Sequence, residues 1–196
     1  VGTRVAGPHP QLRGTFEEAQ GDRFTGWSFQ DAPGEGTFRD TDVKRSGASS
    51  LRIGVASGGR SGNLRISRKL EVRPFTQYHL AAWIRTAGLT NHATLRLFAL
   101  AADGRTLAYQ TIGAKETQDW TRHDVMFNTL DNESVAVYVG VWGGTEGRAW
   151  VDDMTCVEAP LVNVVRRPGC PAELTTADGR VLREGVDHEP IADRRM

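Results

Sequence analysis

The sequence lacks the features that mark membrane proteins and nucleic-acid-binding proteins. Its 196 residues contain no apolar run that approaches the roughly 20 residues needed to cross a bilayer. Basic and acidic side chains balance at 24 each, so no net field draws the chain to nucleic acid or to an anionic membrane. This composition therefore predicts a soluble protein with no nucleic-acid or membrane partner, and it suits a neutral polymer.

Cysteine is scarce, and the sequence does not open with the pattern of a signal peptide. Cys156 and Cys170 are the only cysteines, and a disulfide between them requires the tail to fold back on the last strand. Two free thiols fit equally well, so the pairing stays open. The chain begins at Val1 without a charged n-region or an apolar h-region. We expect a secreted protein, extracellular or periplasmic, whose signal peptide has been removed, and the rarity of lysine beside arginine suggests a bacterial source.

Motifs for catalysis are also missing. The chain has no nucleophile elbow, no His-Glu-x-x-His zinc site, no phosphate-binding loop and no Cys-x-x-Cys pair. Its five histidines are dispersed and lack the spacing of metal ligands. We therefore predict a protein that is not an enzyme.

The pattern that is present is period-two alternation of apolar and polar residues, with turn residues at regular intervals. It predicts an all-β fold, an antiparallel β-sandwich or jelly roll, because no window keeps the 3.6-residue apolar stripe of a helix. The expected strands are 14–18, 27–30, 37–42, 50–55, 62–70, 78–86, 93–100, 107–113, 121–128, 134–142 and 147–158.

The alternation also predicts which side chains enter the core, since successive side chains of a strand point to opposite faces. We expect the inward set to be Tyr78, Leu80, Ala82, Ile84, Leu95, Leu97, Ala99, Val135, Val137, Val139 and Val141. The outward set is His79, Ala81, Trp83, Arg85, Arg96, Phe98, Tyr138 and Trp142.

The domain organisation follows from changes in composition. Residues 1–13 are expected to form a loose N-terminal lead, and residues 14–158 the sandwich. Residues 159–196 contain a linker and then Asp178-Gly179, a strong hairpin signal. Because two strands alone are marginal in water, we expect this C-terminal β-hairpin extension to be the start of a further, truncated domain, or else to pack on the sandwich.

Several separated motifs occur in the order and spacing of a known group. They are Gly14-Thr15-Phe16-Glu17, Gly26-Trp27, Ser46-Gly47, Ser50-Leu51-Arg52-Ile53, Tyr78-His79-Leu80-Ala81-Ala82-Trp83-Ile84-Arg85, Trp120 and Ala149-Trp150-Val151-Asp152-Asp153-Met154. Together, over residues 12–158, they resemble the galactose-binding-like β-sandwich of carbohydrate-binding modules, in particular families four, nine and twenty-two.

The resemblance implies a non-catalytic module that binds polysaccharide or oligosaccharide. Such modules are usually attached to glycoside hydrolases or similar enzymes and hold them close to their substrate. The partners implied are therefore a glycan and a covalently linked neighbouring domain, and we expect a monomer.

The resemblance also implies a structural calcium ion. The matching ligand positions are Glu17, Ser46 and Asp152, with carbonyl help from Thr15 or Ser49, a set of oxygen donors that suits Ca²⁺. By alternation Asp152 shares its side with Trp150 and Met154, which are expected in the core, so its carboxylate needs a partner. The alternative is that Asp152 pairs with Arg52 or Arg45, or caps backbone donors, without a metal.

The outward residues predict a sugar-binding face. Pyranose rings stack on flat aromatic side chains, and planar polar groups take the hydroxyls. If their strands are neighbours in one sheet, the platforms Trp83, Phe98, Tyr138 and Trp142 share a face with His79, Arg85 and Arg96. The alternative is that loops cover Trp83 and Phe98, which then enlarge the core.

Two other functions remain open at this stage. The outer aromatics of a structural or interaction sandwich would contact a neighbouring domain instead of sugar. A jelly-roll polysaccharide lyase would use Tyr138 for proton transfer, with His79, Arg85 and Arg96 around a uronate.

Overall fold

The computed structural model describes residues 8–54, 62–143, 146–159 and 174–188. The chain divides into two units, Ala6–Ala159 on the one hand and Val1–Val5 with Pro160–Met196 on the other. The second unit contains the predicted hairpin, β13 (Leu174–Thr175) and β14 (Val181–Leu182), paired antiparallel. That it opens a further domain stays a prediction, and the predicted partner of Cys156, Cys170, lies outside the described residues.

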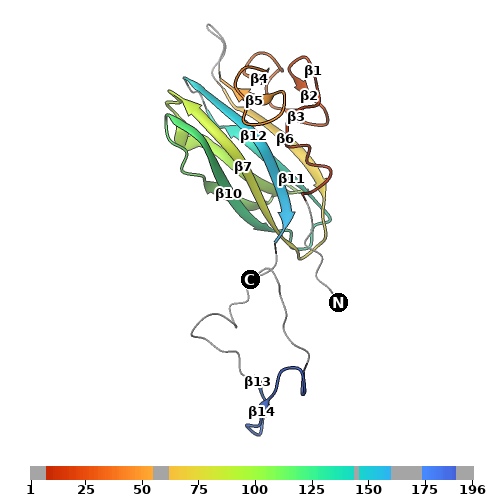
Figure 1. Ribbon diagram of the computed structural model, residues 1–196. Coiled ribbons are helices and arrows are strands. Elements are labelled where there is room, and N and C mark those ends of the chain that lie inside the picture. Colours follow the sequence, from red (N-terminus) through yellow and green to blue (C-terminus); the bar gives the residue numbers. More distant parts are fainter. Residues whose placement is uncertain (1–7, 55–61, 144–145, 160–173, 189–196) are drawn as a thin grey trace. The chain divides into compact units, whose positions relative to one another are not determined.

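The first unit is an antiparallel sandwich of two five-stranded sheets, as predicted (Figure 1). The first sheet has the order β10 (Gln118–Asn128), β7 (Gln77–Ala87), β12 (Arg148–Glu158), β5 (Ser50–Ile53) and β4 (Thr37–Asp40). The second has the order β3 (Ser28–Phe29), β6 (Leu64–Glu71), β11 (Ser134–Val141), β8 (Leu95–Ala101) and β9 (Thr106–Thr111).

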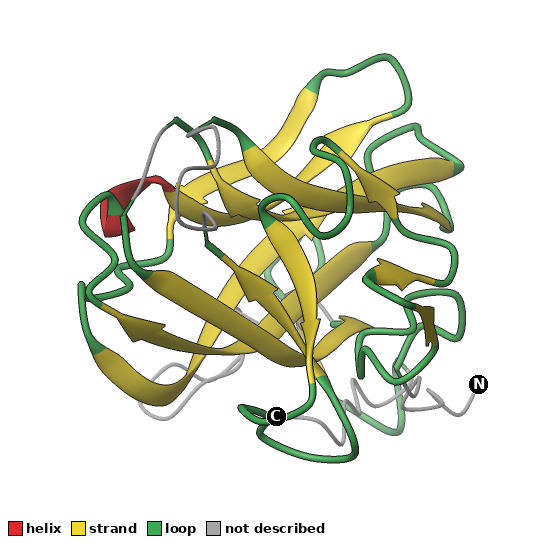
Figure 2. Ribbon diagram, turned by 90° about the horizontal axis from the view of Figure 1, so that it is seen from above, coloured by secondary structure: helices red, strands yellow, loops and turns green. Residues whose placement is uncertain are grey.

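Helix is almost absent from the described part of the chain. The short 3₁₀ helix η1 (His92–Thr94), drawn in red in Figure 2, precedes β8. No helix in the described ranges is long and apolar enough to span a membrane.

The core lies between the two sheets and consists of the side chains that alternation placed inside. Every member of the predicted inward set is buried. The only predicted outward residues to become buried are Ala81 and Phe98, and Phe98 is covered by neighbouring rings on the outer face, as described below. Alternate burial of this kind supplies most of the stabilising apolar contact in a sandwich.

The N-terminal segment differs from its prediction in two ways. Residues 8–13 are not a loose lead, because Leu12 is buried and the His9 N–H donates to the Cys156 carbonyl at 2.7 Å. Residues 14–18 are not a strand, because Phe16 has a φ of 53°, which interrupts extended backbone. The strands in this region are instead the small hairpin of β1 (Ala19–Gln20) and β2 (Arg23–Phe24).

A β-bulge in β12 changes the direction of its side chains. The pairing of β12 with β7 shifts register between Asp152 and Thr155, and Asp153 has a φ of 45°. Met154 therefore enters the core, as expected, but Trp150 does not. The Trp150 side chain lies on the outer face of the first sheet, where its Nε1–H donates to Asp40 Oδ2 at 2.8 Å.

Candidate functional site

Four aromatic side chains gather on the outer face of the second sheet. Phe98 of β8 is in register with Tyr138 of β11 and with Tyr109 of β9. The Phe98 and Tyr138 rings stack with 4.5 Å between centroids and 4° between planes. Trp142, directly after β11, has its ring centroid 4.7 Å from that of Phe98, and Tyr109 meets both of these rings edge-on. We call these four residues the aromatic cluster.

The members of the aromatic cluster differ in their exposure. Phe98 is only 4% exposed, because it lies among the other three rings. Tyr109 is 46% exposed on the edge strand β9, while Tyr138 and Trp142 are half-buried. Phe98 therefore supports a layer of three rings that solvent can reach.

Two arginines lie against this layer. The guanidinium carbon of Arg96 is 4.2 Å from the centroid of the Tyr109 ring, and that of Arg65 is 4.4 Å from the centroid of a Trp142 ring. Both arginines are in register with Gly140 of β11, one on each side. Such contacts are favourable cation–π interactions and hold the guanidinium planes in place.

A hollow of about 370 Å³ adjoins the aromatic cluster. Tyr138 forms part of its wall, and Lys69, Leu100 and Ala136 also line it. These residues are in register across β6, β11 and β8. The surface available to a ligand therefore continues from the aromatic cluster along the strands.

The structure does not bring the seven predicted sugar-binding residues onto one face. Phe98, Tyr138, Trp142 and Arg96 belong to the second sheet, whereas His79, Trp83 and Arg85 are on β7 in the first sheet. Because both groups point away from the core, they lie on opposite sides of the sandwich. The prediction of a single sugar-binding face required these strands to be neighbours in one sheet. They belong to two different sheets, so the prediction is wrong.

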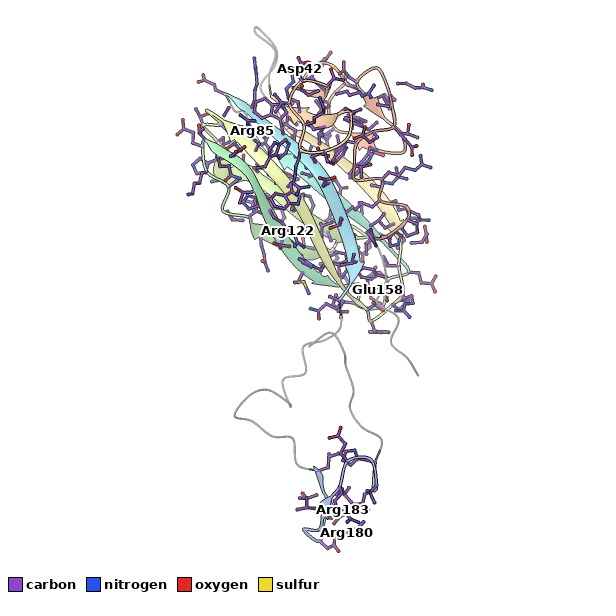
Figure 3. The ribbon with its side chains drawn as sticks, in the orientation of Figure 1. Asp42, Arg85, Arg122, Glu158, Arg180 and Arg183 are labelled. Atoms are coloured by element: carbon purple, nitrogen blue, oxygen red, sulfur yellow. The ribbon has the colours of Figure 1, made fainter. Side chains whose placement is uncertain are left out.

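On the first sheet the predicted residues are occupied with other side chains. The Arg45 guanidinium carbon lies 3.9 Å from the centroid of a Trp83 ring and covers it. His79 Nε2 is 2.5 Å from Asp124 Oδ1, and Arg85 is 4.0 Å from Asp119. Figure 3 shows Arg85 and Arg122 on this face. Its aromatic and charged groups are thus largely satisfied within the protein.

The same separation removes the arrangement that a lyase would need. Tyr138 and Arg96 face one side of the sandwich, and His79 and Arg85 face the other. A proton-transfer group acts only within hydrogen-bond reach of the substrate. These four residues therefore do not form one catalytic site.

The predicted metal ligands come together around the loop that follows β4. Asp152 is fully buried there, and its Oδ2 accepts hydrogen bonds from the N–H groups of Arg45 (2.9 Å) and Ser46 (3.1 Å). Its Oδ1 accepts from the N–H of Asp153 at 2.8 Å. Burial raises the pKa of Asp152, although these three N–H groups act in the opposite direction.

The other predicted ligands are also engaged in hydrogen bonds. Both oxygens of Glu17 accept from the Ala48 N–H, at 2.9 and 3.1 Å. The Ser46 hydroxyl donates to Asp153 Oδ1 at 2.8 Å, and the Ser49 hydroxyl donates to the Phe16 carbonyl at 2.7 Å. Thr15 is exposed.

This arrangement does not fit a calcium ion. Ca²⁺ requires six to eight oxygen ligands, but here the two carboxylates face N–H donors, which would repel a cation. The arrangement fits the alternative, in which Asp152 caps backbone donors.

A thermal melt with and without a calcium chelator tests this interpretation. We expect no change in Tm, because backbone N–H groups already satisfy Asp152 and Glu17. A ligand that binds only the folded state raises Tm. A fall of several degrees with chelator, reversed by added Ca²⁺ and not by Mg²⁺, would instead support the calcium site that the resemblance predicts.

The sequence did not identify Tyr109 and Arg65 as members of the site. Arg65 alternates with the inward Leu64 and Ile66, so its outward direction was readable from the sequence. Tyr109 lies on the edge strand β9, in which one residue is buried and most of the others are exposed. Apolar and polar residues alternate only weakly there, so the direction of the Tyr109 side chain was not readable from the sequence. The contacts of both depend on the order of strands in the sheet.

Comparison with known proteins identifies the fold. No family model and no curated protein matches the sequence. A cyclase from Fischerella sp. TAU superposes with a TM-score of 0.61 at 16% identity, over 79% of this chain and 98% of that one. The CBM22-1 xylan-binding domain from Paenibacillus barcinonensis Xyn10C gives 0.53 at 14% identity, over 82% and 100%. A family 4 carbohydrate-binding module gives 0.51 at 18% identity, over 76% and 99%.

The chain therefore has the β-sandwich fold of carbohydrate-binding modules, as the resemblance predicted. A cyclase is built on a similar sandwich. Because one fold can carry different functions, the function has to be argued from the surface of the sheets.

Proposed function

We propose that this protein is a non-catalytic module that binds polysaccharide on the outer face of its second sheet. The observation that carries the proposal is the aromatic cluster, with Tyr109 46% exposed and two arginines beside it. The fold that the chain shares with carbohydrate-binding modules supports it.

The chemistry of the face suits a sugar chain. A pyranose ring presents apolar C–H groups on its faces and hydroxyls around its rim, so it pairs with a flat ring bordered by donors. Tyr109, Tyr138 and Trp142 offer the rings, and Arg96 and Lys69 offer donors. Because the hollow beside Tyr138 extends this surface along the strands, more than one sugar residue would be in contact.

The setting of the module is part of the same proposal. We propose that it works outside the cell or in the periplasm, as a monomer. Residues beyond the sandwich would connect it to a carbohydrate-active enzyme, such as a glycoside hydrolase, and the module would hold that enzyme near its substrate.

Affinity electrophoresis against a panel of plant and algal polysaccharides tests the proposal. We expect the protein to be retarded by at least one polymer, and Tyr109→Ala to weaken its binding about tenfold to thirtyfold, since an aromatic ring that stacks on the ligand contributes about 1.5 to 2 kcal/mol. The matched control is Trp83→Ala on the first sheet, which should bind like the wild type.

Two results would contradict the proposal. Binding that is lost in Trp83→Ala and kept in Tyr109→Ala would place the site on the first sheet. A folded wild-type protein that binds no polymer would favour the interaction role, in which the aromatic cluster contacts another protein domain.

A further inference from the structure

Charge is distributed unequally between the two sheets of this neutral chain. The strands of the first sheet carry six acidic residues and five arginines. The strands of the second sheet carry Arg65, Arg68, Lys69 and Arg96 but only one acidic residue, Glu71, which pairs with Lys69 at 3.5 Å. Arg68 shares its side of β6 with the buried Ile66 and Leu70, so it does not belong to the outer face. The strands still give the face that bears the aromatic cluster three cationic residues, Arg65, Lys69 and Arg96, against Glu71, which is a positive balance.

Arg65 and Arg96 have no counter-charge in the described part of the chain. Arg65 Nη2 donates to Gln30 Oε1 at 3.3 Å, and no carboxylate lies within ion-pair distance of either guanidinium among these residues. Arg65 Nε and Nη1 and Arg96 Nε are buried without a hydrogen-bond partner. By contrast, Arg45, Arg73, Arg85 and Arg105 each have an acidic partner.

This arrangement is costly without an anion. A buried donor that lacks a partner destabilises the folded protein, and more so when it is charged. An anion beside the two guanidinium groups would offset part of this cost through Coulomb attraction, which is strong where water is partly excluded. The geometry of a guanidinium matches the paired oxygens of a carboxylate or a sulfate.

Gly140 separates the two arginines and carries no side chain. It is the β11 residue in register with Arg65 on one side and Arg96 on the other. Any larger residue would also be excluded by the backbone, because a Cβ at this position would lie 2.3 Å from the Leu64 carbonyl oxygen. The backbone of Leu64 and Arg65 therefore fills the space beside the buried Gly140, so a ligand would meet the two guanidinium groups and not the glycine between them.

We infer that the polysaccharide bound by this face is acidic, and that Arg65 and Arg96 recognise its anionic oxygens while the aromatic cluster stacks on its rings. This inference rests on the proposed function and specifies its ligand class. The anionic group is a uronate carboxylate or a sulfate ester, which have this recognition chemistry in common.

The experiment compares polymers that differ only in charge. Affinity electrophoresis and calorimetry would use polygalacturonate and its methyl-esterified form, a sulfated galactan and its desulfated form, and a single-stranded oligothymidylate. We expect at least tenfold tighter binding to one acidic polymer than to its neutral counterpart. That preference should weaken as NaCl is raised, because salt screens exposed charges.

The variants Arg96→Gln and Arg65→Gln test whether these residues cause the preference. Glutamine keeps a planar donor but removes the charge, so each variant should reduce the preference to about twofold, because binding to the acidic polymer should weaken much more than binding to the neutral one. Arg85→Gln on the first sheet is the matched control and should keep the full preference. Thermal melts would verify that the variants are folded, and Arg96→Lys should restore part of the preference.

The outcomes separate this inference from the proposed function. Equal binding to acidic and neutral polymers that still depends on Tyr109 would overturn the inference and leave polysaccharide binding intact. Failure to bind any glycan would overturn both. Binding of the oligothymidylate alone would also overturn both and assign the positive face to single-stranded nucleic acid, which likewise stacks on aromatic rings.

Discussion

Replacing Asp152 with alanine is expected to lower the free energy of unfolding by about 3 kcal/mol, because buried donors that lose their acceptor are costly. The carboxylate is fully buried and accepts three backbone N–H groups, two of them from the loop after β4. Alanine cannot accept these hydrogen bonds, and water has little access to the position. We expect the loop to detach from β12 and the sandwich to unfold at lower urea concentration.

Urea denaturation of the wild type and of matched variants measures this effect. Asp153→Ala is the control, because Asp153 is its neighbour in the same bulge, contacts Arg45 and Ser46 through its side chain, and remains partly exposed. An exposed ion pair contributes at most about 1 kcal/mol. Equal losses in the two variants would show that burial of Asp152 does not hold the loop.

Replacing Gly140 with alanine is expected to destabilise the sandwich by about 3 kcal/mol, through overpacking and backbone strain together. The φ of Gly140 is 150°, and an added Cβ would meet the backbone of Leu64 and Arg65 at 2.3 and 2.4 Å. Neither neighbour is a flexible side-chain end that could move aside. The central pair of strands β11 and β6 would have to separate.

Thermal and urea denaturation would measure the loss, with Gly62→Ala as the control. A Cβ at Gly62 would have no heavy atom within 4 Å, so this variant should match the wild type closely. Gly140→Ala should also weaken polysaccharide binding in whatever fraction stays folded, since β11 and β6 carry Tyr138 and Arg65. A stable Gly140→Ala variant would mean that β11 and β6 are less closely packed than described.

Alternation along the strands predicted the sandwich because each sheet has one buried face. The valines at 135, 137, 139 and 141 are all buried, and the order of polar and apolar residues is sufficient to assign them. The bulge in β12 was not predictable in this way. It depends on the backbone of Asp153, and it places Trp150 and Met154 on opposite sides of β12, whereas a regular strand would have placed both in the core.

The candidate site was only partly predictable, because strand order is a long-range property. Alternation placed Phe98, Tyr138, Trp142 and Arg96 on an outer face, and they do lie together. The same reasoning could not show that Trp83 belongs to the other sheet. Nor could it show that Arg45, from a loop 38 positions away in sequence, covers the Trp83 ring.

The hydrogen bond between His9 and Cys156 has a consequence for protein engineering. It places the entry and exit points of the sandwich beside each other, and the Ala159 N–H, bonded to the Gln77 carbonyl, fixes the exit to β7. A segment whose two ends are adjacent can be inserted into a surface loop of another protein without forcing that loop open. Residues 8–159 could therefore be grafted into a host enzyme at an exposed turn, which would add the proposed glycan-binding surface without a terminal fusion.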